Sequence, residues 1–411
     1  MFWLVDIFPA IVLQMFSHLF NPLFWLVLLL IAFQYRRMLK IRQSFFGVKN
    51  GNWLPDLVQA TGYGLVGGFI GSLLMVFVGL TLSGSGLNYI WPVALLLLLI
   101  DARFLCFAYA GGIVAFSSLV FGWPQVSVPQ VLALVAILHM VESVLIYFSG
   151  HLGAVPAYIK IGPDQVVGGY VLQRFWPIPV VALLIVGQTT AVHAGVAMPD
   201  WWPLIKPELE VADPDTLLYA LFPVMAGLGY GDLVTARRPQ EKAHISAKYL
   251  FIYSVVLLLL AVLAGKYFAV AVIAALFSPL GHEALIHVGQ RMELQDKPIY
   301  VPPSHGVKVL DVIPKTAAWR IGLRSGDVII GINDMPLFNK AALDYLLRYT
   351  AGFVEVSYIS GQQQSYRREL VKLTDSEFFG VIPVPDPHEK CHMDITTEGP
   401  VIRWLKKRFK W

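Results

Sequence analysis

Long apolar segments are the feature that most constrains this chain. Before residue 285, stretches of about 20 largely apolar residues, the length that a membrane-spanning helix needs, follow one another with short interruptions. Of the 411 residues, only 14% are charged, whereas a soluble domain carries about 25%. After residue 285 the composition becomes that of an ordinary soluble domain. We therefore predict a polytopic α-helical membrane domain followed by a small α+β domain.

Eight or nine spans are expected in the membrane domain. Residues 2–17 form a shorter apolar segment that contains Asp6 and Pro9, and we expect an interfacial helix there. The candidate spans are 19–35, 61–82, 86–101, 103–122, 129–149, 176–197, 216–232, 249–264 and 266–283. The glycine-rich stretch GYGLVGGFIG (62–71) predicts close contacts between helices, because small residues let backbones approach.

Basic residues predict the orientation of the spans, since Lys and Arg concentrate in cytoplasmic loops. With nine spans, one side holds the basic loops 36–49, 150–175 and 233–248, Arg103 and the C-terminal domain. The opposite loops, 83–85, 123–128 and 198–215, hold one Lys and no Arg. We therefore expect a multi-pass cell-membrane protein with its N-terminus outside and its C-terminal domain in the cytoplasm.

The C-terminal domain resembles a PDZ domain of the bacterial, circularly permuted type. The resemblance rests on GVKVLDVIPKTAAWRIGLRSGDVIIGIND (306–334), on a groove helix at 339–349 and on closing strands at 353–359 and 365–373. Gly322 and Gly326 suit turns, and Asp327 is expected to bond backbone amides there. The predicted domains are a membrane domain (1–285), a linker (286–298), a PDZ domain (299–385) and a tail (386–411).

The resemblance to PDZ domains implies a peptide-binding groove, in which an extended segment adds a strand to a sheet edge. We place the carboxylate-binding loop in YVPPSHG (300–306), where Pro302 and Pro303 have no amide to donate. An internal peptide, a partner loop or the chain's own membrane domain are therefore alternative ligands, and a purely supporting domain is a further alternative. The predicted groove residues are Tyr300, Val301, Ser304, His305, Gly306, Val307, Val309, Leu343, Leu346 and Leu347.

The chain ends in VIRWLKKRFKW, where basic and aromatic residues alternate. Basic side chains are attracted to an anionic membrane surface, and aromatic rings favour the interface. We expect this tail to bind membrane lipids, the alternative being a solvated, disordered tail. The residues predicted to contact the membrane are Arg403, Trp404, Lys406, Lys407, Arg408, Lys410 and Trp411.

The segment FSPLGHEALIH (277–287) raises the possibility of an intramembrane zinc protease, whose His-Glu-x-x-His motif places two ligands four residues apart. Here His282 and His287 are five apart, which leaves them about 140° from each other around a helix. We therefore predict no catalytic residues, no metal and no cofactor. Ser278 and Pro279 are expected to end the last span, with His282 and Glu283 capping it or bonding the PDZ domain.

Other polar residues within the spans leave a transporter with a regulatory PDZ domain as a weaker alternative. His139 and Glu142 are three residues apart on one predicted helix, and we interpret them as a buried polar pair that fixes helix packing. Cys106 and Cys391 lie in segments of different character, so no disulfide framework is expected. No nucleic-acid partner is expected either.

Several stretches together resemble the MinJ-type proteins of Gram-positive bacteria. They are DARFLCFAYAGG (101–112), AVPAYIKIGPDQVVGG and RFWPIPV (154–180), FPVMAGLGYGDL with RRPQEK (222–242), and FSPLGHE (277–283). The resemblance implies a non-enzymatic scaffold of the division site. Such a scaffold links a pole and septum protein to the Min division inhibitor and takes part in polar organisation and swarming motility.

Overall fold

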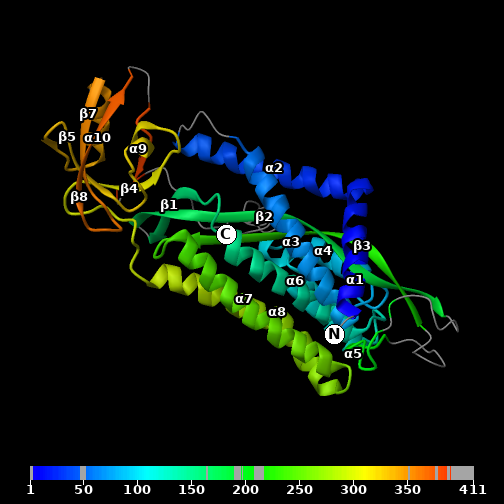
Figure 1. Ribbon diagram of the computed structural model, residues 1–411. Helices are drawn as coiled ribbons and strands as arrows, with labels where there is room; N and C mark the ends of the chain where they lie inside the picture. Colours follow the sequence, from blue (N-terminus) through cyan, green and yellow to red (C-terminus); the bar gives the residue numbers. More distant parts are fainter. Residues whose placement is uncertain are drawn as a thin grey trace.

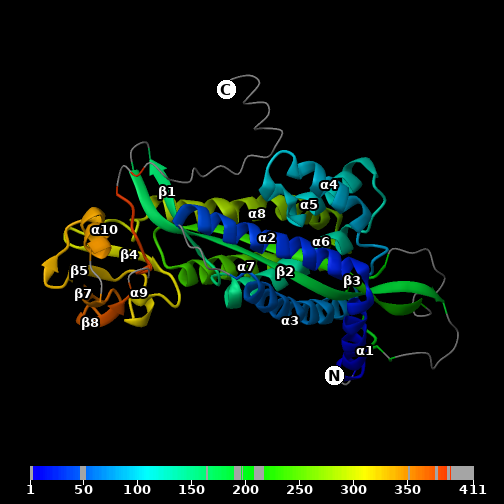
Figure 2. The ribbon, with the colours of Figure 1, turned by 90° about the horizontal axis from the view of Figure 1, so that it is seen from above.

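The computed structural model describes residues 3–46, 52–162, 165–188, 196, 198–207, 217–349, 352–374, 378–386 and 389. Apolar helices and a long β-hairpin lie side by side along one axis, and a small β-rich domain sits at one end of it (Figures 1 and 2). The N-terminal helix lies near the opposite end (Figure 1). The division into a membrane-type part and a C-terminal domain therefore matches the change in composition near residue 285.

Among the described residues, five helices are long and apolar enough to cross a membrane, and three shorter apolar segments accompany them. The long helices are α2 (Pro22–Phe46), α3 (Leu54–Val78), α6 (Val128–Ser149), α7 (Pro239–Ala264) and α8 (Phe268–Gln295). The shorter elements are α1 (Trp3–Ser17) with η1 (His18–Phe20), α4 (Leu87–Leu98) and α5 (Phe107–Phe121), the last two joined through η2 (Ala102–Leu105). Seven of the nine candidate spans thus coincide with helices.

The candidate spans 176–197 and 216–232 were wrong as helices. Residues 176–188 belong to β2 (Gln165–Gln188) and residues 217–232 to β3 (Leu217–Val234), an antiparallel pair. β1 (Val155–Gly162) pairs with the start of β2, which gives the sheet order β1-β2-β3. The hairpin runs along the helices in Figures 1 and 2.

Proline and glycine explain why these apolar segments are strands. Pro177 and Pro179 lie in the middle of β2, and each proline inside a helix costs about 3 kcal/mol. Gly227, Gly229 and Gly231 alternate along β3, and each glycine costs a helix about 1 kcal/mol. In an extended strand the alternation places all three glycines at positions of one face. The mean hydropathy of a segment does not reflect these helix-breaking prolines and glycines.

Helix α3 packs against β2 through a row of small residues. A Cβ atom on Gly64 would lie 2.1 Å from the carbonyl oxygen of Pro177, and one on Gly68 would lie 2.1 Å from that of Pro179. One turn further on, Ser72 accepts a hydrogen bond from the backbone N–H of Val181 at 2.8 Å. The glycine-rich stretch therefore serves close packing on two sides: Gly64 and Gly68 face the strand β2, whereas Gly67 and Gly71 face Val141 of helix α6, as predicted.

The turn between β3 and α7 is fixed by buried charges. Lys242 is buried, donates to the carbonyl of Gly289 at 2.8 Å and lies 3.5 Å from a carboxylate oxygen of Asp232. Arg237 pairs with Glu293 at 3.0 Å, near the end of α8. These contacts hold the end of the hairpin and the start of α7 against the last turns of α8.

The C-terminal domain has a sheet in the order β8-β7-β5-β4-β9, with β6 paired to β5. Its strands are β4 (Val307–Val312), β5 (Val328–Ile332), β6 (Met335–Pro336), β7 (Gly352–Ile359), β8 (Tyr366–Leu373) and β9 (Val381–Pro383), and its helices are α9 (Ala317–Arg320) and α10 (Lys340–Tyr349). Gly322 and Gly326 have φ of 81° and 92°, which favours glycine. Asp327 accepts from the amides of Arg324 and Gly361 at 2.8 and 2.9 Å. Both turn predictions are confirmed.

Candidate functional site

Helix α8 continues through the segment that was expected to end it. Pro279 lies inside the helix, which runs on to Gln295. Ser278 donates to the carbonyl of Ala108 in α5 at 2.7 Å, and Pro279 packs against Gly112 of the same helix. The expectation that Ser278 and Pro279 mark a break was therefore wrong, because both residues serve a close contact between α5 and α8.

A thiol and two imidazoles meet where α5, α6 and α8 come together. Sγ of Cys106 lies 3.0 Å from Nε2 of His139 and 3.6 Å from Nε2 of His282. One ligand atom from each residue lies within 4.8 Å of the others. We call this group the Cys106–His139–His282 cluster. A thiolate and two neutral imidazoles are a donor set typical of Zn²⁺ sites.

Hydrogen bonds orient both imidazoles of the cluster. Nδ1 of His139 lies 2.7 Å from the carbonyl oxygen of Val135, a contact in which only the ring nitrogen can donate. In the neutral ring, Nε2 of His139 is then left with its lone pair toward Cys106. Nδ1 of His282 lies 3.5 Å from the hydroxyl oxygen of Tyr109. The ring of Tyr253 packs edge-on against both histidines.

Glu283 connects the cluster to a second set of polar side chains. It accepts hydrogen bonds from Arg103 at 2.8 Å and from Tyr109 at 2.5 Å, and His287 lies 3.2 Å away. The expectation that His282 and Glu283 bond the PDZ domain was wrong, since both face the segment 101–112. His287 pairs with Glu283 while His282 faces Cys106, so these two histidines do not share one site.

The cluster lies about half-way along two long helices. His139 is the twelfth of the 22 residues of α6, and His282 is the fifteenth of the 28 residues of α8. The turn that carries Cys106 joins α4 and α5, which have only 12 and 15 residues. Irregular backbone at the depth of the membrane interior is tolerated where protein surrounds it. The side chains of Arg103 and Cys106 in this turn contact α6 and α8.

No local pattern in the sequence predicts the cluster. Cys106 is 33 residues from His139 and 176 from His282. Spacing along the chain favours other pairs, namely His282 with His287 and His139 with Glu142. A cysteine and a histidine that each stand in an otherwise apolar segment were the only available signals.

The sheet of the C-terminal domain presents an edge that differs from the predicted one. β4 lies between β5 and β9, so both of its sides are paired. β9 is the outer strand, and among the described residues it has a neighbouring strand on the β4 side alone. The path of the sheet therefore ends in β8 on one side and in β9, the neighbour of β4, on the other.

The predicted groove residues separate into three places. Val307 and Val309 are buried on β4, and Tyr300 is buried against the β1–β2 hairpin. Ser304 and His305 are exposed in the preceding turn, beside Val301 and Gly306. On α10, Leu343 is buried, and Leu346 and Leu347 pack against the domain core. The structure therefore gathers the three leucines on one helix but sets them apart from Tyr300.

The C-terminal domain is bonded directly to the membrane-type part. The amide of Gly168 donates to the carbonyl of Tyr300 at 2.9 Å. The hydroxyl of Tyr170 contacts the carbonyl oxygen of Leu310, and Arg42 pairs with Asp311 at 3.1 Å. Burial raises the pKa of the Asp311 carboxyl, and the nearby Arg42 guanidinium opposes this effect. The β1–β2 hairpin, which begins at Val155, thus supplies much of the surface against which the C-terminal domain packs.

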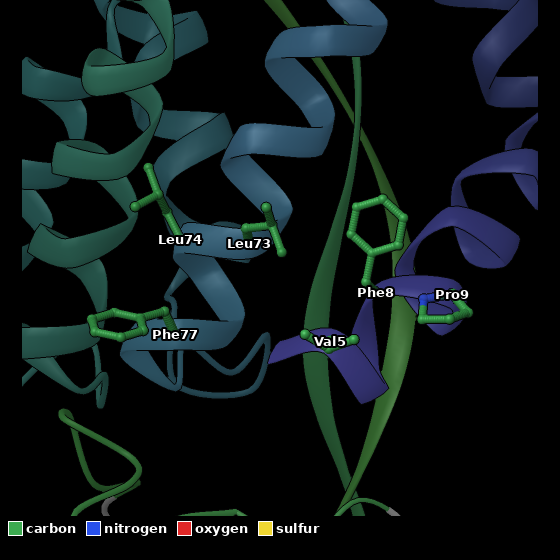
Figure 3. A pocket seen from close by; sticks show the side chains of 6 residues that line it. All are labelled: Val5, Phe8, Pro9, Leu73, Leu74 and Phe77. Atoms are coloured by element: carbon green, nitrogen blue, oxygen red, sulfur yellow. The ribbon is translucent and has the colours of Figure 1, made fainter. Parts of the chain in front are cut away.

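A pocket of about 550 Å³ lies between α1 and α3 (Figure 3). Its lining consists of Val5, Phe8, Pro9, Leu73, Leu74 and Phe77. None of these side chains carries a donor or acceptor, so the pocket offers no groups for catalysis. The predicted membrane-contacting residues between Arg403 and Trp411 lie outside the described residues.

Comparison with known proteins agrees with both parts of this architecture. The family model described as PDZ domain matches residues 308–354. Over 395 residues, 90% of this chain and 94% of the relative, the chain is 24% identical to the cell division topological determinant MinJ of Bacillus subtilis (strain 168). The PDZ domain of an SdrC-like protein from Listeria monocytogenes is 23% identical, covers 20% of this chain and 90% of its own, and has a TM-score of 0.18. The chain therefore carries a C-terminal PDZ domain behind several apolar helices and resembles the MinJ-type division determinants along nearly its whole length.

Proposed function

We propose that this protein is a non-enzymatic membrane scaffold that recruits protein partners to the division site through its PDZ domain, with a role in polar organisation. The observation that carries the proposal is the similarity to MinJ, which extends over 90% of this chain and 94% of that one. Partners connected with the Min system and with the pole and septum follow from the same resemblance. No step of this role requires a catalytic residue.

The peptide would bind at the edge of β9, beside α10. Lys340, at the start of α10, pairs with Glu389 at 3.1 Å and lies over the ring of Tyr158. The hydroxyl of Tyr158 in turn donates to the carbonyl of Pro383 in β9. These contacts bring the start of α10 near the end of β9, so Leu346 and Leu347 are suited to line the groove.

The orientation we propose places the PDZ domain in the cytoplasm and the N-terminus outside. Arg42 follows the apolar part of α2 and pairs with Asp311 of the PDZ domain. Arg237 precedes α7 and pairs with Asp296, at the PDZ end of α8. Since basic residues favour the cytoplasmic side, both pairs support this orientation. In this proposal the membrane is crossed by the five long helices and by the two strands of the hairpin, and not by the nine helices expected from the sequence.

Fluorescence microscopy of the full-length chain in dividing cells tests the proposal. We expect the tagged protein to concentrate at septa and poles. Leu346→Asp, which places a charge in the proposed groove, should leave the protein in the membrane but spread it evenly. Tyr345→Asp, on the exposed side of the same helix, is the matched control and should behave as the parent. An even membrane signal from the parent protein would contradict the division role, and septal localisation of Leu346→Asp would contradict the groove.

A further inference from the structure

We propose that the Cys106–His139–His282 cluster binds a Zn²⁺ ion that joins the turn between α4 and α5 to the middle of α6 and α8. The proposal rests on the geometry of three side chains and is independent of the proposed scaffold function. Cys106 would bind as the thiolate after losing its proton, and the two histidines would bind through neutral imidazole nitrogens. One position would remain for a water molecule.

The distances within the cluster fit tetrahedral zinc. Zn–S and Zn–N bonds of about 2.3 and 2.1 Å at a tetrahedral angle place sulfur and nitrogen about 3.6 Å apart. Sγ of Cys106 and Nε2 of His282 are already 3.6 Å apart. The separation to Nε2 of His139 is 3.0 Å, so one imidazole has to move outward by about half an ångström. That is a small rotation of a side chain.

The surroundings prepare the histidines for a metal. A metal-binding histidine usually donates its other ring nitrogen to a carbonyl or carboxylate, which fixes the tautomer. His139 makes this bond to Val135 at 2.7 Å. Tyr253 forms a wall beside both rings, and its hydroxyl already donates to the carbonyl of Ser278 at 2.7 Å. The ring nitrogen of His139 that faces Cys106 is therefore available as a ligand.

A metal at this place has a clear structural consequence. The α4–α5 turn carries Asp101, Arg103 and Cys106 and is built on the short 3-10 helix η2, with extended backbone at Asp101 and Cys106. Binding energy available only in the assembled state becomes folding energy. A zinc ion would therefore hold this turn against two long helices that are distant in the sequence.

Metal analysis of the full-length protein tests the inference. The protein is purified in detergent with a tag free of histidine and cysteine, and its metals are measured by mass spectrometry. We expect about one zinc per chain, and less than one tenth of that in Cys106→Ser and His282→Ala. His287→Ala, on the same helix as His282, is the matched control and should keep its zinc. Stoichiometric copper in place of zinc would overturn the assignment of the metal.

Reconstitution with Co²⁺ keeps the test decisive if purification removes the metal. After chelation, Co²⁺ should give a thiolate-to-cobalt absorption band in the parent and in His287→Ala, and no such band in Cys106→Ser. Elution of Cys106→Ser from a sizing column at the parent volume shows that the fold is retained. A parent protein that takes up neither zinc nor cobalt, or a Cys106→Ser variant that retains its metal, overturns the site.

Discussion

The hydroxyl of Ser72 lies 2.8 Å from the backbone nitrogen of Val181, and it accepts the hydrogen bond of that amide. Val181 belongs to β2, where it is paired with Pro223 of β3 and buried. The same hydroxyl donates to the carbonyl of Gly68, one turn earlier in α3. The Ser72 side chain thus accepts the hydrogen bond that a neighbouring strand would otherwise accept. This allows the apolar helix α3 to pack against β2 in place of a further strand.

Ser72→Ala should destabilise the protein. It leaves the buried amide of Val181 without its acceptor, which costs about 1–3 kcal/mol. Thermal unfolding in detergent would measure the loss. Thr61→Ala is the control, because the hydroxyl of Thr61 donates to the carbonyl of Leu57 within α3 and should matter less. Equal unfolding temperatures for Ser72→Ala and the parent would show that this bond contributes nothing.

Gly68→Ala should destabilise the protein, although it adds only one methyl group. The added methyl group would lie 2.1 Å from the carbonyl oxygen of Pro179, so the helix or the strand has to move. Overpacking of this kind costs about 1–3 kcal/mol. Gly62→Ala, with nothing within 4 Å of the new Cβ, should be neutral or stabilising because alanine favours helices. If both variants unfold at the same temperature, the packing of α3 on β2 is not tight.

Lys242→Met should lower stability strongly, because Asp232 would lose its buried partner. Removing one member of a buried ion pair costs about 3–5 kcal/mol. The double variant Lys242→Met/Asp232→Asn should recover part of this loss, since it removes the uncompensated carboxylate. Lys248→Met, at an exposed position of α7, is the control. A double variant less stable than Lys242→Met would contradict this account.

Tyr170→Phe should loosen the PDZ domain from the β1–β2 hairpin. The hydroxyl of Tyr170 donates to the carbonyl of Leu310 and accepts from the hydroxyl of Ser325 at 2.9 Å. A loss of about 1 kcal/mol corresponds to roughly fivefold faster hydrogen exchange at the amide of Gly168, which bonds Tyr300 across the contact. Tyr366→Phe, whose hydroxyl bonds Ser357 within the PDZ domain, should leave that amide unchanged. Unchanged exchange in Tyr170→Phe would exclude a role for its hydroxyl in docking.

Asp311→Asn should gain stability relative to the parent as the pH rises toward neutral. The pKa of the Asp311 carboxyl is raised above 3.8, first by burial and against the opposing effect of Arg42. A raised pKa in the folded state means that the stabilisation is present below pH 3.8 and is lost as the pH rises through the folded pKa. The advantage of Asp311→Asn should therefore shrink as the pH falls toward 3.8. Asp334→Asn, at an exposed carboxyl, is the control, and a stability difference between Asp311→Asn and the parent that does not change with pH would contradict the raised pKa.

The two segments of the long hairpin show where sequence reasoning reached its limit. Hydropathy identified residues 176–197 and 216–232 as apolar but could not distinguish a span from a buried strand. Pro177, Pro179 and the alternating glycines of β3 carried the missing information. Two prolines separated by one residue disrupt a helix even in a strongly apolar segment. Counting prolines and glycines within each apolar segment would therefore have reduced the predicted number of helices.

The sequence by itself determined the apolar N-terminal part, the positions of seven helices and the turns of the PDZ domain. These features depend on local composition and on residues such as Gly322 and Asp327, which act within a few positions of themselves. Only the tertiary structure decided that β9 forms an edge of the PDZ sheet beside β4 and that Cys106 meets His139 and His282. Such pairings depend on how helices and strands distant in the chain pack together, and the spacing of residues along one segment contains no record of that packing.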